Sequence, residues 1–169
     1  MIEITIYSPL KPLLFKQKVK TNTELKGYFQ AKLFHKISGK ISYKALIKSS
    51  KIEILEQKKD NKNRNWHLHS INKDQGKLLG TLIMESSAKE TLNQGHTSFT
   101  LTLENEKFTI TKELMNYNTK CNVMNTNNEV IASHYPSGLF KRRIDLYQDM
   151  SHKQTCAMLL VLSLVVFVA

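Results

Sequence analysis

The run from Cys156 to Ala169, CAMLLVLSLVVFVA, constrains the fold more than any other stretch of the chain. It carries no charged residue and only one hydroxyl group, that of Ser163. As a helix it is apolar on every side, so it needs protein or lipid around its whole circumference. We therefore expect the rest of the chain to be organised around this segment.

The length of this run favours burial in protein over passage through a bilayer. As a helix its 14 residues span ~21 Å, against ~30 Å for the hydrocarbon core of a membrane. Upstream extension meets His152, Lys153 and Gln154, which do not belong in lipid. We expect a buried helix over about 151–168. A tail anchor and a final buried strand are the alternatives, the strand because four valines lower the helix propensity.

Helix-start signals precede the apolar run. Ser151 and Gln154 have the spacing of a capping box. We read Asp145 and Asp149 as residues that cap this helix or favour its positive end, in preference to a pair of catalytic carboxylates.

The rest of the chain reads as short alternating segments typical of β-strands. The clearest case places Phe99, Leu101 and Leu103 on one face and Ser98, Thr100 and Thr102 on the other. About a dozen such segments cover 2–7, 13–20, 25–30, 31–48, 51–57, 66–69, 77–85, 98–104, 108–110, 117–124, 129–135 and 139–147. We expect a two-residue hairpin connection at Asn105-Glu106, a polar loop over 86–95 and a break at 136–138. Residues 31–37 fit a helix as well as a strand.

These segments predict a mainly β fold: a roughly twelve-stranded antiparallel closed β-barrel around a central hydrophobic C-terminal α-helix. The strands occupy about 2–147, and one domain spans 1–169. A closed barrel leaves no exposed sheet edge, and a barrel of that strand number is too wide for side chains alone to fill. The apolar helix fills it.

Cysteine usage and the N-terminus indicate the compartment. The start MIEITIY has neither a basic nor an apolar signal region, and Cys121 and Cys156 are the only cysteines. We expect a cytoplasmic protein with free, buried thiols, attached if at all to the inner face of the membrane as a peripheral protein.

The net charge of +11 is unevenly distributed. Residues 1–64 hold 15 basic and five acidic residues, a balance of +10, whereas residues 65–169 hold ten basic and nine acidic, a balance of +1. Such asymmetry favours an anionic partner. The chain is also rich in Lys and Asn, so a solvated surface with no partner is the competing interpretation.

The candidate binding residues form a lysine row, namely Lys36, Lys40, Lys44 and Lys48. If they lie on one strand face they are ~13 Å apart, and Lys16, Lys18 and Lys20 fill the gaps. We expect these lysines to bind anionic phospholipid headgroups. A nucleic-acid-binding module, or a protein-interaction module with incidental charge, is the alternative. Only Phe34 and Tyr43 provide aromatic rings within 31–48, which disfavours nucleic acid.

No other motif indicates catalysis, so we expect a non-enzymatic protein with no cofactor, no metal site and no small-molecule substrate. His67 and His69 share one strand face and form half of a zinc site at most. Cys121 reads as a buried apolar residue on a strand and not as a nucleophile, and Trp66 reads as a core or rim anchor. Neither of the common phosphate-binding glycine motifs is present.

The meander from Trp66 through His134, followed by the ending DLYQDMSHKQTCAMLLVLSLVVFVA, resembles the tubby C-terminal-like superfamily. That group takes in tubby proteins, LURP-one-related proteins, phospholipid scramblases and small bacterial relatives. The resemblance covers nearly the whole chain by pattern and implies a twelve-stranded barrel around a hydrophobic C-terminal helix. Tubby proteins bind phosphoinositides through basic residues on the barrel exterior, but no motif in this chain assigns that role to particular residues. Scramblase activity is not expected, because the calcium-loop and palmitoylation motifs are missing.

Overall fold

The computed structural model describes the backbone of residues 2–5, 16–21, 26–32, 42–47, 50–57, 63–72, 75–113, 120–138 and 141–167. It describes side-chain surroundings within residues 51–57, 63–71, 76–87, 89–113, 120–137 and 142–165.

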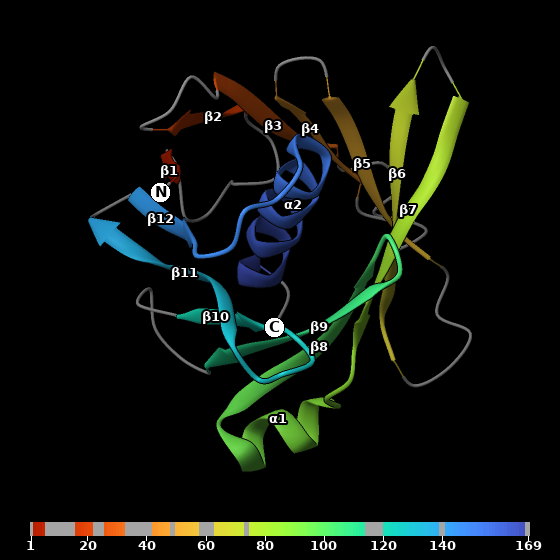
Figure 1. Ribbon diagram of the computed structural model, residues 1–169. Helices are drawn as coiled ribbons and strands as arrows, with labels where there is room; N and C mark the ends of the chain where they lie inside the picture. The colour runs from red at the N-terminus through yellow and green to blue at the C-terminus, as the bar shows by residue number, and fades with distance from the viewer. Residues whose placement is uncertain are drawn as a thin grey trace.

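Antiparallel strands curl around one long helix (Figure 1). The first four strands are β1 (Ile2–Thr5), β2 (Lys16–Thr21), β3 (Lys26–Lys32) and β4 (Ser42–Ile47). The next four are β5 (Ser50–Glu56), β6 (Asn65–Asn72), β7 (Gln75–Met84) and β8 (His96–Leu103). The last four are β9 (Glu106–Glu113), β10 (Cys121–Met124), β11 (Val130–Gly138) and β12 (Lys141–Leu146). The helices are α1 (Ala88–Gln94) and α2 (His152–Phe167).

Strands β5 to β12 form a curled antiparallel sheet in which each strand pairs with the next. The backbone of β4, β3 and β2 continues this sheet from β5, again in sequence order. Strand β1 pairs with both β2 and β12. The predicted mainly β fold with a C-terminal helix is therefore confirmed.

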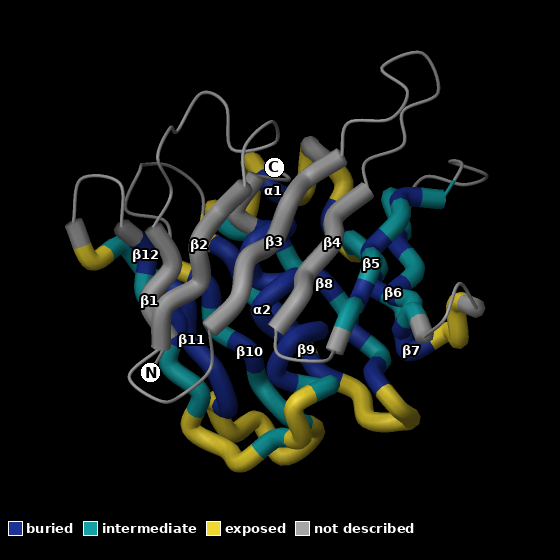
Figure 2. Tube along the Cα trace, turned by 90° about the horizontal axis from the view of Figure 1, so that it is seen from above, coloured by how far each residue is buried: buried dark blue, intermediate teal, exposed yellow. Residues whose placement is uncertain are grey.

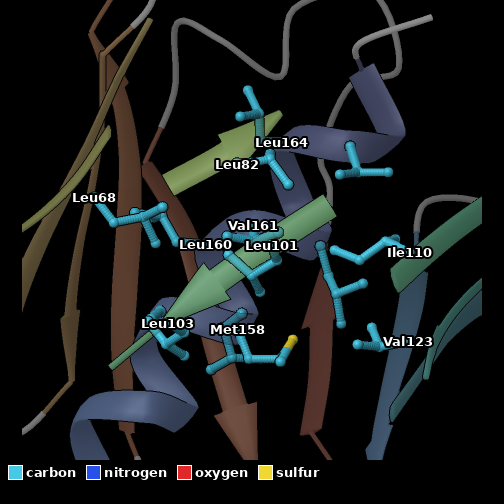
Figure 3. Close-up of a cluster of buried hydrophobic side chains, with 14 of the residues drawn as sticks. Leu68, Leu82, Leu101, Leu103, Ile110, Val123, Met158, Leu160, Val161 and Leu164 are labelled. Atoms are coloured by element: carbon cyan, nitrogen blue, oxygen red, sulfur yellow. The ribbon is translucent and has the colours of Figure 1, made fainter. Parts of the chain in front are cut away.

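The core is made by the inward face of the sheet and by α2 from Thr155 to Val165. Figure 2 shows α2 and the strand segments that face it as buried, with exposed residues gathered at the turns. Strand β8 alternates between half-buried and buried residues, which puts Phe99, Leu101 and Leu103 inside as the sequence predicts. Figure 3 shows Met158, Leu160, Val161 and Leu164 of α2 among leucines of the strands, together with Ile110 and Val123.

Every described residue of α2 from Thr155 to Val165 is buried, which confirms that this helix is enclosed by protein. Its start is the predicted capping box: the Gln154 backbone N–H donates to Ser151 Oγ at 3.2 Å, and the Ser151 N–H donates to Gln154 Oε1 at 3.0 Å. The predicted capping role of Asp145 is wrong. That carboxylate lies in β12 and accepts hydrogen bonds from Tyr135 and Arg143.

The predicted loop over 86–95 is wrong, because it contains α1. Ser87 and Glu90 form a second capping box, and Gly95 ends the helix with a left-handed φ of 72°. The polar composition of this segment suggested a loop. The two caps, however, supply hydrogen-bond partners for the terminal N–H and C=O groups that a short helix leaves unpaired.

Two predicted strand boundaries also move. The two-residue turn between β8 and β9 is Glu104-Asn105 and not Asn105-Glu106. Glu104 and Asn105 have positive φ angles of 49° and 75°, as the two central residues of a type I′ turn require. The predicted break at 136–138 lies instead within β11, which continues through Pro136 to Gly138 across a register shift. Irregular positions of this kind tolerate a proline in a strand.

Candidate functional site

Register places seven lysines on one face of the four adjacent strands β2 to β5. One ladder row joins Lys16, Gln30, Lys44 and Glu53. The strands carry no register shift there, and successive residues alternate between faces, so every second residue from that row shares its face. Ile52 and Ile54, which are fully buried, belong to the opposite face. We call the set of lysine positions the lysine face: Lys16, Lys18, Lys20, Lys26, Lys32, Lys44 and Lys51.

Only one of the four lysines singled out from the sequence falls within the described residues. Lys44 lies in β4 and belongs to the lysine face, in register with Gln30 on one side and Glu53 on the other. Lys36, Lys40 and Lys48 lie outside the described residues. Within the described residues, the lysines are therefore spread over four neighbouring strands and do not follow a single strand.

The basic run Lys141-Arg142-Arg143, which begins β12, does not add to that face as a unit. Arg142 is only 9% exposed and donates a hydrogen bond to His134, so it points inward and is paired. Arg143 donates from Nε to Asp145 at 2.9 Å and lies over the ring of Tyr135. The carboxylate of Asp145 therefore offsets the Arg143 charge locally.

A buried polar cluster lies on the inward face of β8 to β12, and sequence reasoning missed it as a group. Cross-strand pairing joins Thr97 to Lys112, Lys112 to Cys121, and Cys121 to His134. Arg142 comes from the same end of the neighbouring strand β12. All five side chains are buried. The signal was present in the sequence, since Lys112 follows Phe108 and Ile110 at strand spacing.

Hydrogen bonds connect this cluster to the central helix. Arg142 donates from Nε to Nε2 of His134 at 2.8 Å, and Nδ1 of His134 lies 3.2 Å from the Leu162 carbonyl oxygen. A guanidinium can only donate, so Nε2 must accept and the histidine hydrogen must be on Nδ1. That hydrogen is donated to Leu162. The imidazole is therefore neutral, and it joins β12 to α2 through β11.

The electrostatics of the cluster oppose nucleophilic chemistry. Burial, and next the Arg142 charge, lower the pKa of His134 to about 3. Burial raises the pKa of Cys121 to about 11, against the opposing influence of Lys112 and Arg142. A protonated thiol is a poor nucleophile, so this environment disfavours attack by Cys121, and the prediction that it is buried on a strand is confirmed. The arrangement is suited to holding α2 in place.

His67 and His69 share one face of β6, as predicted, and this face is the outward one. The flanking Trp66 and Leu68 are fully buried, and the two imidazole ring centroids lie 6.2 Å apart. Burial, and next the neighbouring His69, lower the pKa of His67. Among the described residues, no three His, Cys, Asp or Glu side chains are grouped closely enough to hold a metal ion.

Comparison with known proteins gives no match to a family model, a curated protein or a solved structure. Among the described helices, none has the length and apolar content that crossing a membrane requires.

Proposed function

We propose that the chain is a tubby-like, twelve-stranded closed barrel around a central helix that docks without catalysis on anionic phospholipid surfaces. The lysine face makes the contact. In a cell this corresponds to a cytoplasmic protein held peripherally at the inner face of the membrane.

The pairing of β1 supports closure of the barrel. Ile2 is in register with Thr21 of β2 and with Ile144 of β12, so one short strand joins the first part of the sheet to its last strand. Closure removes both free edges, which would otherwise template pairing with other chains. A closed wall also accounts for the burial of α2, which has no polar side of its own.

The observation that carries the docking proposal is the density of lysine on four neighbouring strands. At the described positions of the lysine face, Glu53 is the single acidic residue beside seven lysines. Each lysine near an anionic bilayer contributes ~1 kcal/mol, so several acting together give reversible, salt-sensitive docking. Neighbouring positions of such a sheet are ~5 Å apart between strands, and positions on one face are ~7 Å apart along a strand.

A lipid surface fits this face better than nucleic acid. Binding of single strands relies on aromatic rings interleaved with the basic residues. Tyr43 pairs in register with the fully buried Ile54 and so belongs to the core-facing side of β4. At the described positions of the lysine face, Tyr28 is the sole aromatic residue.

The opposite region of the sheet is nearly neutral, which favours one docking orientation. After His96, the outward positions of β8 are hydroxyl residues, as are those in the middle of β9: Ser98, Thr100, Thr102, Thr109 and Thr111. These side chains gain little from an anionic surface. The molecule is therefore expected to approach a bilayer with β2 to β5 first.

Co-sedimentation with phosphatidylcholine vesicles, with and without phosphatidylserine, tests the proposal. We expect binding only to the phosphatidylserine vesicles, at low salt, and release at high salt. Lys18, Lys44 and Lys51→Gln together remove three neighbouring charges and should lower the partition constant about 100-fold. Lys89, Lys107 and Lys120→Gln, three exposed lysines outside the lysine face, make the same change in net charge and should lower it far less.

The four lysines of the original row give a second variant. Lys36, Lys40, Lys44 and Lys48→Gln should also weaken binding, and an unchanged partition constant would mean that their charge is incidental. Equal binding to both kinds of vesicle would overturn electrostatic docking. A salt-dependent gel shift with single-stranded nucleic acid, without vesicle binding, would favour the nucleic-acid alternative instead.

A further inference from the structure

Two histidines extend the lysine face onto the next strand. His67 and His69 lie on the outward side of β6, and β6 pairs directly with β5. The register sets His69 beside Glu53, which in turn is beside Lys44 in β4. Neighbouring strands are ~5 Å apart, so the histidine pair lies within about one Debye length of the nearest lysine positions at 0.1 M salt.

The charged surroundings of the pair are few and can be named. From β5, Leu55 faces His67 and Glu53 faces His69. From β7, Thr81 faces His67 and Leu78 faces His69. Two lysines stand next along these strands, Lys51 in β5 and Lys77 in β7. Glu53 is thus the one charged residue that faces the pair in register, whereas Lys77 pairs with the buried Ser70 and so belongs to the other face of β7.

We propose that protonation of His67 and His69 strengthens docking of the lysine face on anionic phospholipid, so that attachment increases as the pH falls from about 8 to about 6. This inference rests on the proposed function of the lysine face. It assigns the pair a role that does not need a metal ion: two positive charges are added at the border of the surface that meets the bilayer.

The direction follows from linkage. An anionic surface attracts imidazolium more than neutral imidazole, so the docked state takes up protons and acid favours docking. Each added cation raises the partition constant about five-fold, and both together raise it about 30-fold. Burial beside β5 and β7, and next the neighbouring His69, lower the pKa of His67, so His67 accepts its proton at a lower pH than an ordinary histidine. The increase in binding therefore extends to a lower pH than an ordinary histidine would give.

The test is vesicle partition at about pH 8 and about pH 6, with phosphatidylserine vesicles, whose charge stays constant over this range. The wild type should bind more tightly at the lower pH, by up to about 10-fold, because protonation is incomplete there. His67→Gln with His69→Gln should bind like the wild type at the higher pH and lose most of the increase. His67→Arg with His69→Arg should bind at both pH values at least as tightly as the wild type at the lower one. Circular dichroism at both pH values checks the fold.

A matched control uses an exposed histidine that does not belong to the sheet. His152→Gln, at the exposed start of α2, should retain the full increase. If the double glutamine variant keeps the increase, or if wild-type binding is equal at both pH values, the histidine proposal is overturned while docking itself stands. If the wild type fails to bind at either pH, both proposals are overturned.

Discussion

Arg142 donates a hydrogen bond to His134 across 2.8 Å in the interior of the curled sheet, and His134 passes the connection on to the Leu162 carbonyl of α2. Three consecutive elements, β11, β12 and α2, thus meet through one neutral imidazole. Burying a guanidinium is costly unless its hydrogen bonds are made. The contact therefore fixes how β12, β11 and the central helix fit together, and its consequences are measurable.

Replacing the imidazole tests how much this connection stabilises the protein. In His134→Ala, Arg142 loses its Nε acceptor and the Leu162 carbonyl loses a donor. We expect the free energy of unfolding to fall by about 2–4 kcal/mol, as is typical when a buried charged group loses a partner. Urea denaturation measures it. His96→Ala, at a half-buried histidine outside the cluster, should cost under about 1 kcal/mol. Equal losses for the two variants would contradict the importance of the connection.

The same histidine makes stability depend on pH. The pKa of His134 falls from 6.5 in the unfolded chain to about 3 in the folded one. Between these values the unfolded chain binds the additional proton, so stability is full above pH 6.5 and is lost as the pH falls. This group should remove about 2 kcal/mol between about pH 7 and about pH 5.

Urea midpoints across that range measure the loss, with His134→Gln as the comparison. The glutamine variant starts less stable but should show a shallower pH dependence, because it lacks the titrating ring. Parallel pH profiles for the two proteins would assign the acid sensitivity to other groups.

How far the sequence predicts this fold depends on which signal each element carries. Strand β8 was predictable because Phe99, Leu101 and Leu103 alternate with hydroxyl residues, and one buried face fixes that pattern. Helix α2 was predictable because it is apolar all round and begins with a capping box. Helix α1 was missed because its signal lies in its caps, Ser87 and Gly95, and not in any apolar periodicity.

The candidate sites follow the same logic. Sequence spacing identified the outward pair His67 and His69, because the strand period alone sets their face. It did not assemble Lys112, His134 and Arg142, which lie on three strands and meet only through cross-strand register. Charged residues are also expected on the surface by default. The burial of Lys112 and Arg142 depends on residues of other strands, which the local sequence around each one cannot predict.

Glycine at position 80 is required by the close approach of β7 and β8. A Cβ there would lie 2.1 Å from the Thr102 carbonyl oxygen and 3.1 Å from Leu103 Cα, both backbone atoms that cannot move independently. Gly80→Ala should therefore shift the strand pair and cost about 2–4 kcal/mol. Thermal and urea unfolding measure this loss.

Gly76, in the same strand, provides the matched control. A Cβ at this position would meet His69 at 3.7 Å, an ordinary contact. Gly76→Ala should change stability by less than about 1 kcal/mol, with either sign, since alanine also restricts the unfolded chain. If Gly80→Ala were as stable as Gly76→Ala, the two strands would have to be farther apart than the register indicates.

The final prediction concerns α2 as the source of the core. Leu160 is fully buried in this helix, whereas Leu92 in α1 is 76% exposed. Leu160→Ala removes apolar atoms from a closely packed interior and leaves a cavity, so we expect a loss of about 2–5 kcal/mol. Leu92→Ala removes the same atoms from a surface helix and should change stability by less than about 0.5 kcal/mol. Both are leucine-to-alanine changes in helices, so helix propensity cancels and the difference reports burial alone. Urea unfolding of the two variants measures that difference, and similar small losses for both would mean that α2 is not enclosed by the strands.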